Sequence, residues 1–204
     1  MIEERLPEAP LDFEERSHLY KYHGVTLPSV TQIMKPMSGM LYDNVANDIL
    51  MAASNRGTRV HEQISNFVLY GIAETDSDTD KYVSAYMRFN DDVNPKFVDS
   101  EYRTYHKLLR YAGTIDLVGY IEPDDGTGVD VIDLKTTATF HPVLLGAQLG
   151  AYAQALESHG IKTRKLYGLQ LLKSGKYRLE RVDDGFKNFL HCLAIYNAMA
   201  AEMK

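Results

Sequence analysis

The chain has 204 residues, 45% of them apolar and 25% charged, which are average values for a soluble globular protein. This composition excludes intrinsic disorder and fibrous architectures, and the length predicts a single domain over residues 1–204. No apolar run approaches the roughly 18 residues of a membrane span, and the acidic start lacks the order of a secretory signal. The single cysteine, Cys192, excludes an internal disulfide or a four-cysteine metal cluster. We therefore expect a cytoplasmic protein with no membrane partner.

The net charge is −6, from 22 basic and 28 acidic residues, which argues against a protein that coats nucleic acid through bulk charge. The charges are unevenly placed, however. Acids concentrate in residues 1–16 and 74–80, whereas residues 160–181 hold seven bases against Glu180 alone. This basic stretch is either a solvated strand face or a rim that meets a polyanion, so net charge does not settle the partner.

Hydrophobic periodicity and turn residues predict a short hairpin, followed by helices, three strands, a helix, two more strands and a final helix. The first predicted helix covers about 42–54, and a second begins after a cap at Thr58. Three more are predicted over about 78–93, Pro142–His159 and 184–203. A hairpin is predicted within 18–34, and Pro36 and Gly39 separate it from the first helix. Five further strands are predicted over 97–106, 108–121, 129–136, 165–172 and 176–182. The fold class is therefore α/β (mixed α+β), around one sheet.

The strand over 129–136 carries two opposite charges near its end. Side chains alternate along a strand, so Asp133 and Lys135 project to one face, with Cα atoms about 6.5–7 Å apart, while Leu134 points to the other. Burying charges costs several kcal/mol each unless partners or a metal compensate. The pair is either an ordinary ion pair at the rim of a sheet or part of a catalytic unit.

The preceding strand holds one acid, Asp116, inside the apolar run YAGTIDLV. The turn-rich segment EPDDGTG predicts that strands 108–121 and 129–136 pair as an antiparallel hairpin. In that case Asp116 can stand beside Asp133, and two adjacent carboxylates require a cation between them or protonation of one. Hard oxygen ligands of this kind favour Mg²⁺ or Mn²⁺.

Four further residues are ambiguous when each is taken singly. His61 lies on a helix with an apolar face, where most histidines are structural, and Glu101 opens a strand as an edge charge does. Gln148 and Tyr152 lie four residues apart and share one helix face, which ordinary amphipathic packing also explains.

In chain order, however, the segments GTRVHE, SEYR, YAGTIDLVG, VIDLKTT and QLGAY resemble the RecB-type, phage-exonuclease branch of the PD-(D/E)XK nuclease superfamily. The resemblance covers about residues 57–152. It implies a restriction-endonuclease-like core over 42–182, with a central mixed sheet flanked by helices. An N-terminal extension with a hairpin (1–41) and a C-terminal helix (183–204) complete the chain.

The resemblance also implies roles for individual residues. The implied metal ligands are His61, Asp116, Asp133 and the Leu134 carbonyl, and the implied catalytic residues are Glu101, Asp116, Asp133 and Lys135. The implied substrate-binding residues are Gln148 and Tyr152, with Thr136 beside the metal ligands. The implied cofactor is one or two Mg²⁺ or Mn²⁺ ions, with neither an iron–sulfur cluster nor a nucleotide.

The expected activity is a metal-dependent DNA exonuclease of phage or bacterial recombination or repair, with DNA ends as partner. Self-association or a single-strand annealing protein is a further partner expected only by analogy. Three alternatives remain open. They are a structure- or sequence-specific endonuclease on the same core, a catalytically inactive nucleic-acid-binding module, and an unrelated metal-binding domain.

Overall fold

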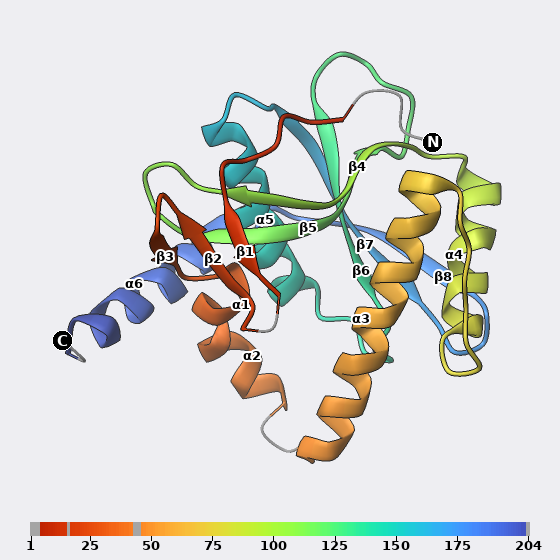
Figure 1. The fold of residues 1–204 in the computed structure, drawn as a ribbon, viewed down its shortest axis with the longest axis horizontal. Coiled ribbons are helices and arrows are strands. Elements are labelled where there is room, and N and C mark those ends of the chain that lie inside the picture. Colours follow the sequence, from red (N-terminus) through yellow and green to blue (C-terminus); the bar gives the residue numbers. More distant parts are fainter. Residues whose placement is uncertain (1–4, 16, 43–45, 203–204) are drawn as a thin grey trace.

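The computed structural model describes residues 5–15, 17–42 and 46–202 (Figure 1). Its centre is a five-stranded sheet in the order β4-β5-β6-β7-β8. The strands are β4 (Lys96–Tyr105), β5 (Ala112–Tyr120), β6 (Val129–Lys135), β7 (Thr163–Leu171) and β8 (Tyr177–Val182). β6 and β7 run parallel and the other neighbours antiparallel, so the sheet is mixed, as expected.

Helices cover both faces of this sheet (Figure 1). They are α1 (Val30–Ile33), α2 (Lys35–Tyr42), α3 (Asn47–Tyr70), α4 (Asp80–Val93), α5 (Pro142–Ser158) and α6 (Phe186–Glu202). One apolar core joins α3 and α4 to the sheet, and a second joins α1, α5 and α6 to it. The mixed α/β class is thus confirmed, in the arrangement expected of a restriction-endonuclease-like core. Within the described ranges, no helix combines the length and apolar character needed to cross a membrane.

A second, small antiparallel sheet precedes the core. It consists of β1 (Asp12–Glu14), β2 (Leu19–Tyr22) and β3 (Val25–Leu27). The β2–β3 hairpin was expected, whereas β1 was not, because it has only three residues and lies in an acidic segment. The Pro28 carbonyl accepts a hydrogen bond from the Ala112 N–H at 3.0 Å, and the hydroxyls of Tyr20 and Thr114 are 2.8 Å apart. These bonds fix the small sheet against the start of β5.

Two helix predictions are wrong in their boundaries. Pro36 was expected to interrupt the chain, but it lies in the first turn of α2, where a missing N–H breaks no helical hydrogen bond. Thr58 was expected to cap a new helix, but its hydroxyl donates to the Ser54 carbonyl inside the single helix α3. Of the predicted helix over 42–54, residues 43–45 lie outside the described residues.

The strand expected over 108–121 begins only at Ala112. Before it, the ring nitrogen Nδ1 of His106 accepts hydrogen bonds from the N–H groups of Leu108 and Leu109, and Arg110 adopts a φ of 59°. These contacts satisfy a turn and bend the chain, so the apolar letters of this segment do not extend the strand. The turn leaves the Leu108 side chain 86% exposed.

The basic stretch over 160–181 is divided by the fold. Arg164 is only 6% exposed and donates to the buried carboxylate of Asp130, and Lys165 is also held in an ion pair. Because β6 and β7 are parallel and Lys135 is aligned with Gln170, the start of β7 lies at the opposite end of the sheet from Lys135. The first part of this stretch therefore does not form a rim beside the predicted site.

Candidate metal centre

The site forms where strands β5 and β6 separate. Their backbone pairing covers Leu117–Gly119 with Asp130–Ile132 and stops one residue short of Asp116 and Asp133. At that point Oδ2 of Asp116 accepts a hydrogen bond from the Leu134 N–H at 2.6 Å. A side-chain carboxylate thus takes the place of a backbone acceptor, and the expected hairpin brings the two aspartates to one fork.

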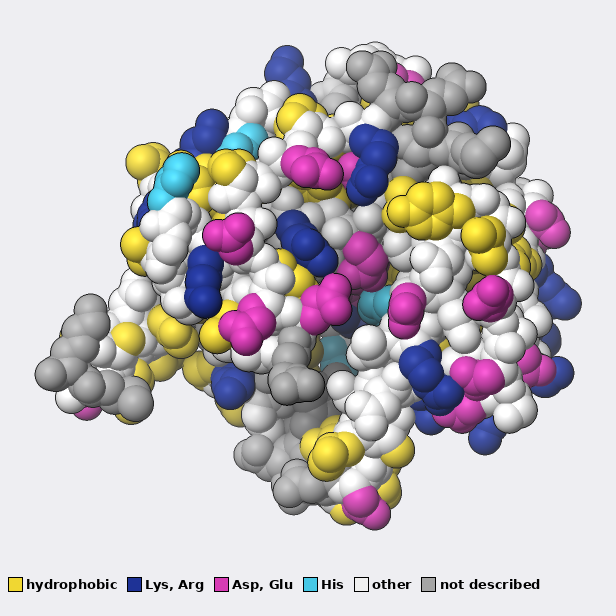
Figure 2. Space-filling model, viewed as in Figure 1, with side chains coloured by type: hydrophobic (Ala, Val, Ile, Leu, Met, Phe, Trp, Pro, Cys, Tyr) yellow, Lys and Arg dark blue, Asp and Glu magenta, His cyan; other side chains and the backbone are white. Residues whose placement is uncertain are grey.

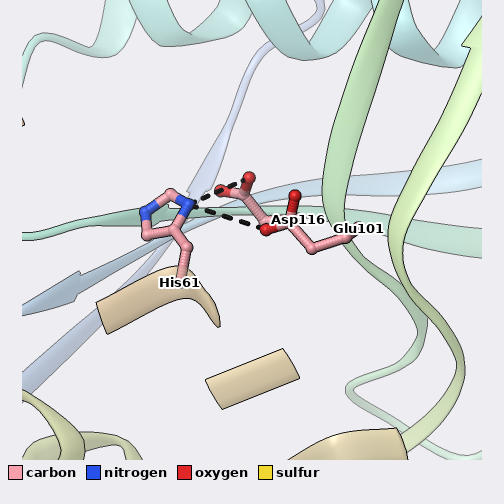
Figure 3. A group of neighbouring side chains, drawn as sticks. All are labelled: His61, Glu101 and Asp116. Atoms are coloured by element: carbon pink, nitrogen blue, oxygen red, sulfur yellow. Dashed lines mark ion pairs between the residues drawn. The ribbon is translucent and has the colours of Figure 1, made fainter. Parts of the chain in front are cut away.

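Three side chains from different elements converge at this fork (Figure 3). His61 projects from α3, Glu101 from β4 and Asp116 from β5. Nδ1 of His61 is 3.3 Å from Oδ1 of Asp116 and 3.9 Å from Oε1 of Glu101. One ligand atom from each of the three lies within 4.8 Å of the others. Two carboxylates and an imidazole at this spacing fit a divalent cation such as Mg²⁺ or Mn²⁺.

Glu101 has an unusual backbone conformation. Its φ is 52°, in the left-handed region that residues other than glycine seldom adopt. The residues on either side keep a regular register, Ser100 with Leu117 and Tyr102 with Ile115. Such a conformation costs about 1–3 kcal/mol and concentrates at functional sites. Glu101 still shares one face of the sheet with Arg103 and with Thr114 and Asp116 of β5, since all four line one cavity, and its carboxylate lies toward His61 (Figure 3).

The carboxylates of the site carry more negative charge than their neighbours neutralise. Burial and the nearby Asp116 charge raise the pKa of Glu101 to about 7. Burial likewise raises the pKa of Asp133 to about 6, although Lys135 opposes the shift. Burial lowers the pKa of His61, but Asp116, Glu101 and Asp133 outweigh it and raise the pKa to about 9. A cation bound here removes this repulsion, so the donor set fits a metal in electrostatics as well as in geometry.

Asp133 and Lys135 form an ion pair beside the three converging side chains. Nζ of Lys135 lies 2.7 Å from Oδ2 of Asp133 and 3.4 Å from Oε1 of Gln148. The Asp133 side chain is 3% exposed, whereas that of Lys135 is 32% exposed. Leu134 packs into the core beneath α3 and α4. The strand alternation predicted from the sequence is therefore confirmed.

Gln148 and Tyr152 extend this contact chain along α5. Nε2 of Gln148 is 3.3 Å from the Tyr152 hydroxyl, and the Tyr152 ring is 5% exposed. The ring lies directly over Gly113 of β5, where a Cβ atom would stand 2.5 Å from Cε1 of Tyr152. Gly113 thus sets how close Tyr152 can approach the strand that carries Asp116.

Replacing Gly113 with alanine is therefore expected to lower the free energy of unfolding by about 1–3 kcal/mol through overpacking. Denaturant unfolding of Gly113→Ala, Tyr152→Ala and the double variant measures the coupling. The double variant should lose less stability than the sum of the two single variants, because the shorter side chain makes room for the new methyl. Strict additivity would show that the Gly113–Tyr152 contact is not the cause.

A second prediction concerns Glu101 in the metal-free protein. Its folded pKa of about 7 exceeds the ordinary value of 4.5, so the folded state binds more protons and stability falls as pH rises between these values. We expect the Glu101→Gln protein to melt like the wild type near about pH 4.5 and at a higher temperature near about pH 8. Melting temperatures in EDTA test this, with Glu62→Gln as a control from the same surroundings. Equal wild-type and Glu101→Gln melting temperatures at the higher pH would contradict the charge repulsion.

The converging side chains open into a cavity of about 550 Å³. Figure 2 shows acidic and basic side chains gathered around a hollow at the centre of this face. The cavity is bounded by the predicted residues His61, Glu101, Asp116, Asp133, Lys135, Gln148 and Tyr152. Its wall also includes Phe13, His18, Tyr20 and Arg103, which the sequence reading did not select. Arg103 could have been selected from the sequence, because it lies two residues after Glu101 in SEYR and so shares its strand face. Nothing in the local sequence indicated that residues of the small sheet would contact this site.

Two predicted residues differ from this group. Thr136 is almost fully buried, does not line the cavity, and lies beside Gly57 of α3. The Leu134 side chain faces the core, but its N–H points to Asp116, and the N–H and carbonyl of one strand residue point the same way. The Leu134 carbonyl is thus directed to the Asp116 side of the strand.

No protein-family model matches the chain, and no curated protein matches its sequence. Among solved structures, the chain is similar to a candidate exonuclease from Eubacterium rectale, with 11% identity and a TM-score of 0.47 over 83% of this chain and 72% of that one. It is also similar to an alkaline exonuclease from Laribacter hongkongensis, with 13% identity and a TM-score of 0.37 over 71% of this chain and 80% of that one.

Proposed function

We propose that this protein is a metal-dependent DNA exonuclease of the PD-(D/E)XK type, with residues 1–204 forming one nuclease domain. The observation that carries the proposal is the convergence of His61, Glu101 and Asp116 within 4.8 Å, beside the Asp133–Lys135 ion pair. Chemically, this constellation supplies hard metal ligands and a lysine charge at one fork of a sheet. Both favour phosphodiester hydrolysis, because the transition state concentrates negative charge on the phosphate oxygens.

Four groups are proposed to hold the cation: the side chains of His61, Asp116 and Asp133, and the Leu134 carbonyl. Glu101 lies close enough to His61 to join them or to hold a second ion. A bound Mg²⁺ or Mn²⁺ supplies Lewis-acid stabilisation of the phosphate charge and lowers the pKa of water. His61 must lose its proton to bind metal, and its pKa of about 9 means that binding near neutral pH releases that proton.

Lys135 is proposed to act directly on the substrate. Its Nζ donates to a phosphate oxygen or to the attacking water and offsets charge that develops on the phosphorus oxygens. Asp133 and the Gln148 amide oxygen fix the position of this ammonium group. Gln148 is held in turn by Tyr152, which packs on β5. Gln148 and Tyr152 are thus proposed as substrate-binding residues. Thr136 is proposed in the same role with weaker support, because it does not line the cavity.

A test of the proposal compares closed circular, nicked and linear DNA in Mg²⁺ or Mn²⁺, with EDTA as control. An exonuclease degrades the linear DNA and leaves closed circles intact. Cutting of closed circles would instead indicate an endonuclease on the same core. Metal binding without cleavage of any substrate would indicate a nucleic-acid-binding module or an unrelated metal-binding domain.

We further propose that the protein acts in the cytoplasm of a bacterial or phage-infected cell, in recombination or repair. Its proposed partners are DNA ends, with self-association or a single-strand annealing protein as further candidates by analogy. Co-purification of the tagged protein with a strand-annealing activity tests the last of these.

A further inference from the structure

One wall of the cavity, beside the metal-ligand candidate Glu101, is built from an arginine stacked on an aromatic ring. The guanidinium carbon of Arg103 lies 4.5 Å from the centroid of the Phe13 ring. Phe13 comes from β1 of the small N-terminal sheet, whereas Arg103 lies on β4, two residues after Glu101. Both residues line the cavity. The pair therefore places a cation next to the candidate metal centre, on an element that also supplies one of its acids.

The rings around Phe13 support this stack. Phe13 lies 4.7 Å from Tyr20 and 5.0 Å from His18 between ring centroids. Tyr20 is 1% exposed, and its hydroxyl is 2.8 Å from that of Thr114 on β5. The aromatic wall is thus fixed to the same strand that carries Asp116. Stacking holds the planar guanidinium over the ring and leaves the N–H groups at its edge available to a ligand.

Arg103 lies in a cavity where, among the described residues, acidic side chains outnumber Lys and Arg. Among the described residues, the Lys and Arg side chains that line the cavity are Arg103 and Lys135. Five acidic residues line it as well, Glu15, Glu62, Glu101, Asp116 and Asp133. No carboxylate of the described residues lies within ion-pair distance of Arg103, unlike Arg164, whose donors are taken by Asp130. A polyanion that enters this cavity can therefore contact two cationic side chains, Arg103 and Lys135.

The size of the cavity limits what enters. Its volume of about 550 Å³ is that of a site for one small-molecule-sized group, since such sites span about 300–1,000 Å³. One nucleotide of a single strand is a ligand of this class, whereas a duplex presents two backbones. Proteins that bind single-stranded nucleic acid also combine cations, which contact the backbone, with aromatic side chains, on which bases stack.

We propose that the cavity takes one unpaired DNA strand and that Arg103, stacked on Phe13, binds the phosphate next to the one being hydrolysed. This inference rests on the proposed nuclease function and adds its substrate form. Arg103 is then a substrate-binding residue, and Phe13 is a positioning residue that acts through it. Duplex DNA must fray at its end before the reacting strand enters.

The experiment compares Arg103→Ala with Arg110→Ala, which is a matched control. Arg110 is also stacked on an aromatic ring, with its guanidinium carbon 4.9 Å from the Tyr22 ring centroid, but it does not line the cavity. We expect Arg103→Ala to raise KM for single-stranded DNA about tenfold with a smaller change in kcat, because a charge-assisted bond to bound substrate is lost. Arg103→Lys should recover part of the loss, and Phe13→Leu should weaken binding less than Arg103→Ala.

Equilibrium binding in EDTA separates this proposal from the nuclease proposal. Fluorescence anisotropy with labelled oligo-dT at several salt concentrations should give a log–log slope smaller by about 0.7 for Arg103→Ala, and unchanged for Arg110→Ala. A wild-type protein that cleaves DNA, combined with equal KM and salt slope for Arg103→Ala, would overturn the Arg103 site alone. Absence of cleavage with the slope difference intact would overturn the nuclease function alone. Faster cleavage of blunt duplex than of single strands would overturn the unpaired-strand substrate.

Discussion

Replacing Lys135 with alanine is expected to slow DNA cleavage by about 10²–10³-fold, the usual cost of removing one donor that stabilises developing oxyanion charge. The lysine ammonium is the cationic group 2.7 Å from Asp133, at the fork that holds His61, Glu101 and Asp116. Single-turnover cleavage of end-labelled linear DNA in Mn²⁺ measures the loss.

The fold should survive this change, because the Lys135 side chain is 32% exposed and lies outside the apolar cores. Asp133 loses its partner, so its pKa rises further and a modest decrease in melting temperature is expected above that pKa. Lys165→Ala is the matched control, since Lys165 also makes a 2.7 Å ion pair but at the opposite end of the sheet. Wild-type cleavage by the Lys135→Ala protein would remove the lysine from the mechanism.

Replacing Asp116 with asparagine is expected to weaken Mn²⁺ binding by at least about 100-fold and to abolish cleavage. Asparagine has the same shape, and its amide oxygen can still accept the hydrogen bond from the Leu134 N–H. The substitution removes only the negative charge of residue 116, which attracts the cation. Titration calorimetry with Mn²⁺ measures the affinity, and Glu62→Gln controls for loss of an acid elsewhere in the cavity.

The same variant tests the electrostatics without metal or DNA. Burial lowers the pKa of His61, and the charge and hydrogen bond of Asp116 are the largest influences that raise it to about 9. We expect the His61 pKa to fall toward its ordinary value of 6.5 in Asp116→Asn, as followed by the imidazole proton resonances against pH. An unchanged titration would show that Asp116 does not control this histidine.

Those features of the site that depend on local alternation could be predicted from the sequence. Asp133 and Lys135 share one side of a strand because the strand period is two, and the turn-rich EPDDGTG segment predicts the antiparallel partner. Predicting that Asp116 and Asp133 lie at one fork would have required the pairing register of β5 and β6. Register depends on contacts across the sheet that a single sequence does not contain.

Other features depend on interactions between distant parts of the chain. The left-handed conformation of Glu101 has no local glycine or asparagine to indicate it, so this conformation could not be foreseen. The stack of Arg103 on Phe13 joins residues far apart in the sequence. Helix α3 runs through Thr58 because the hydroxyl bonds back within the helix, an alternative that competes with capping at the same residue.

The most direct test of the central claim is cleavage of end-labelled linear DNA by the purified wild-type protein, with and without Mn²⁺, beside the Asp116→Asn protein. The account predicts nucleotide release by the wild type only when metal is present, and none by Asp116→Asn under any condition. Release that persists in EDTA, or that is unchanged in Asp116→Asn, would contradict a metal-dependent nuclease built on this site.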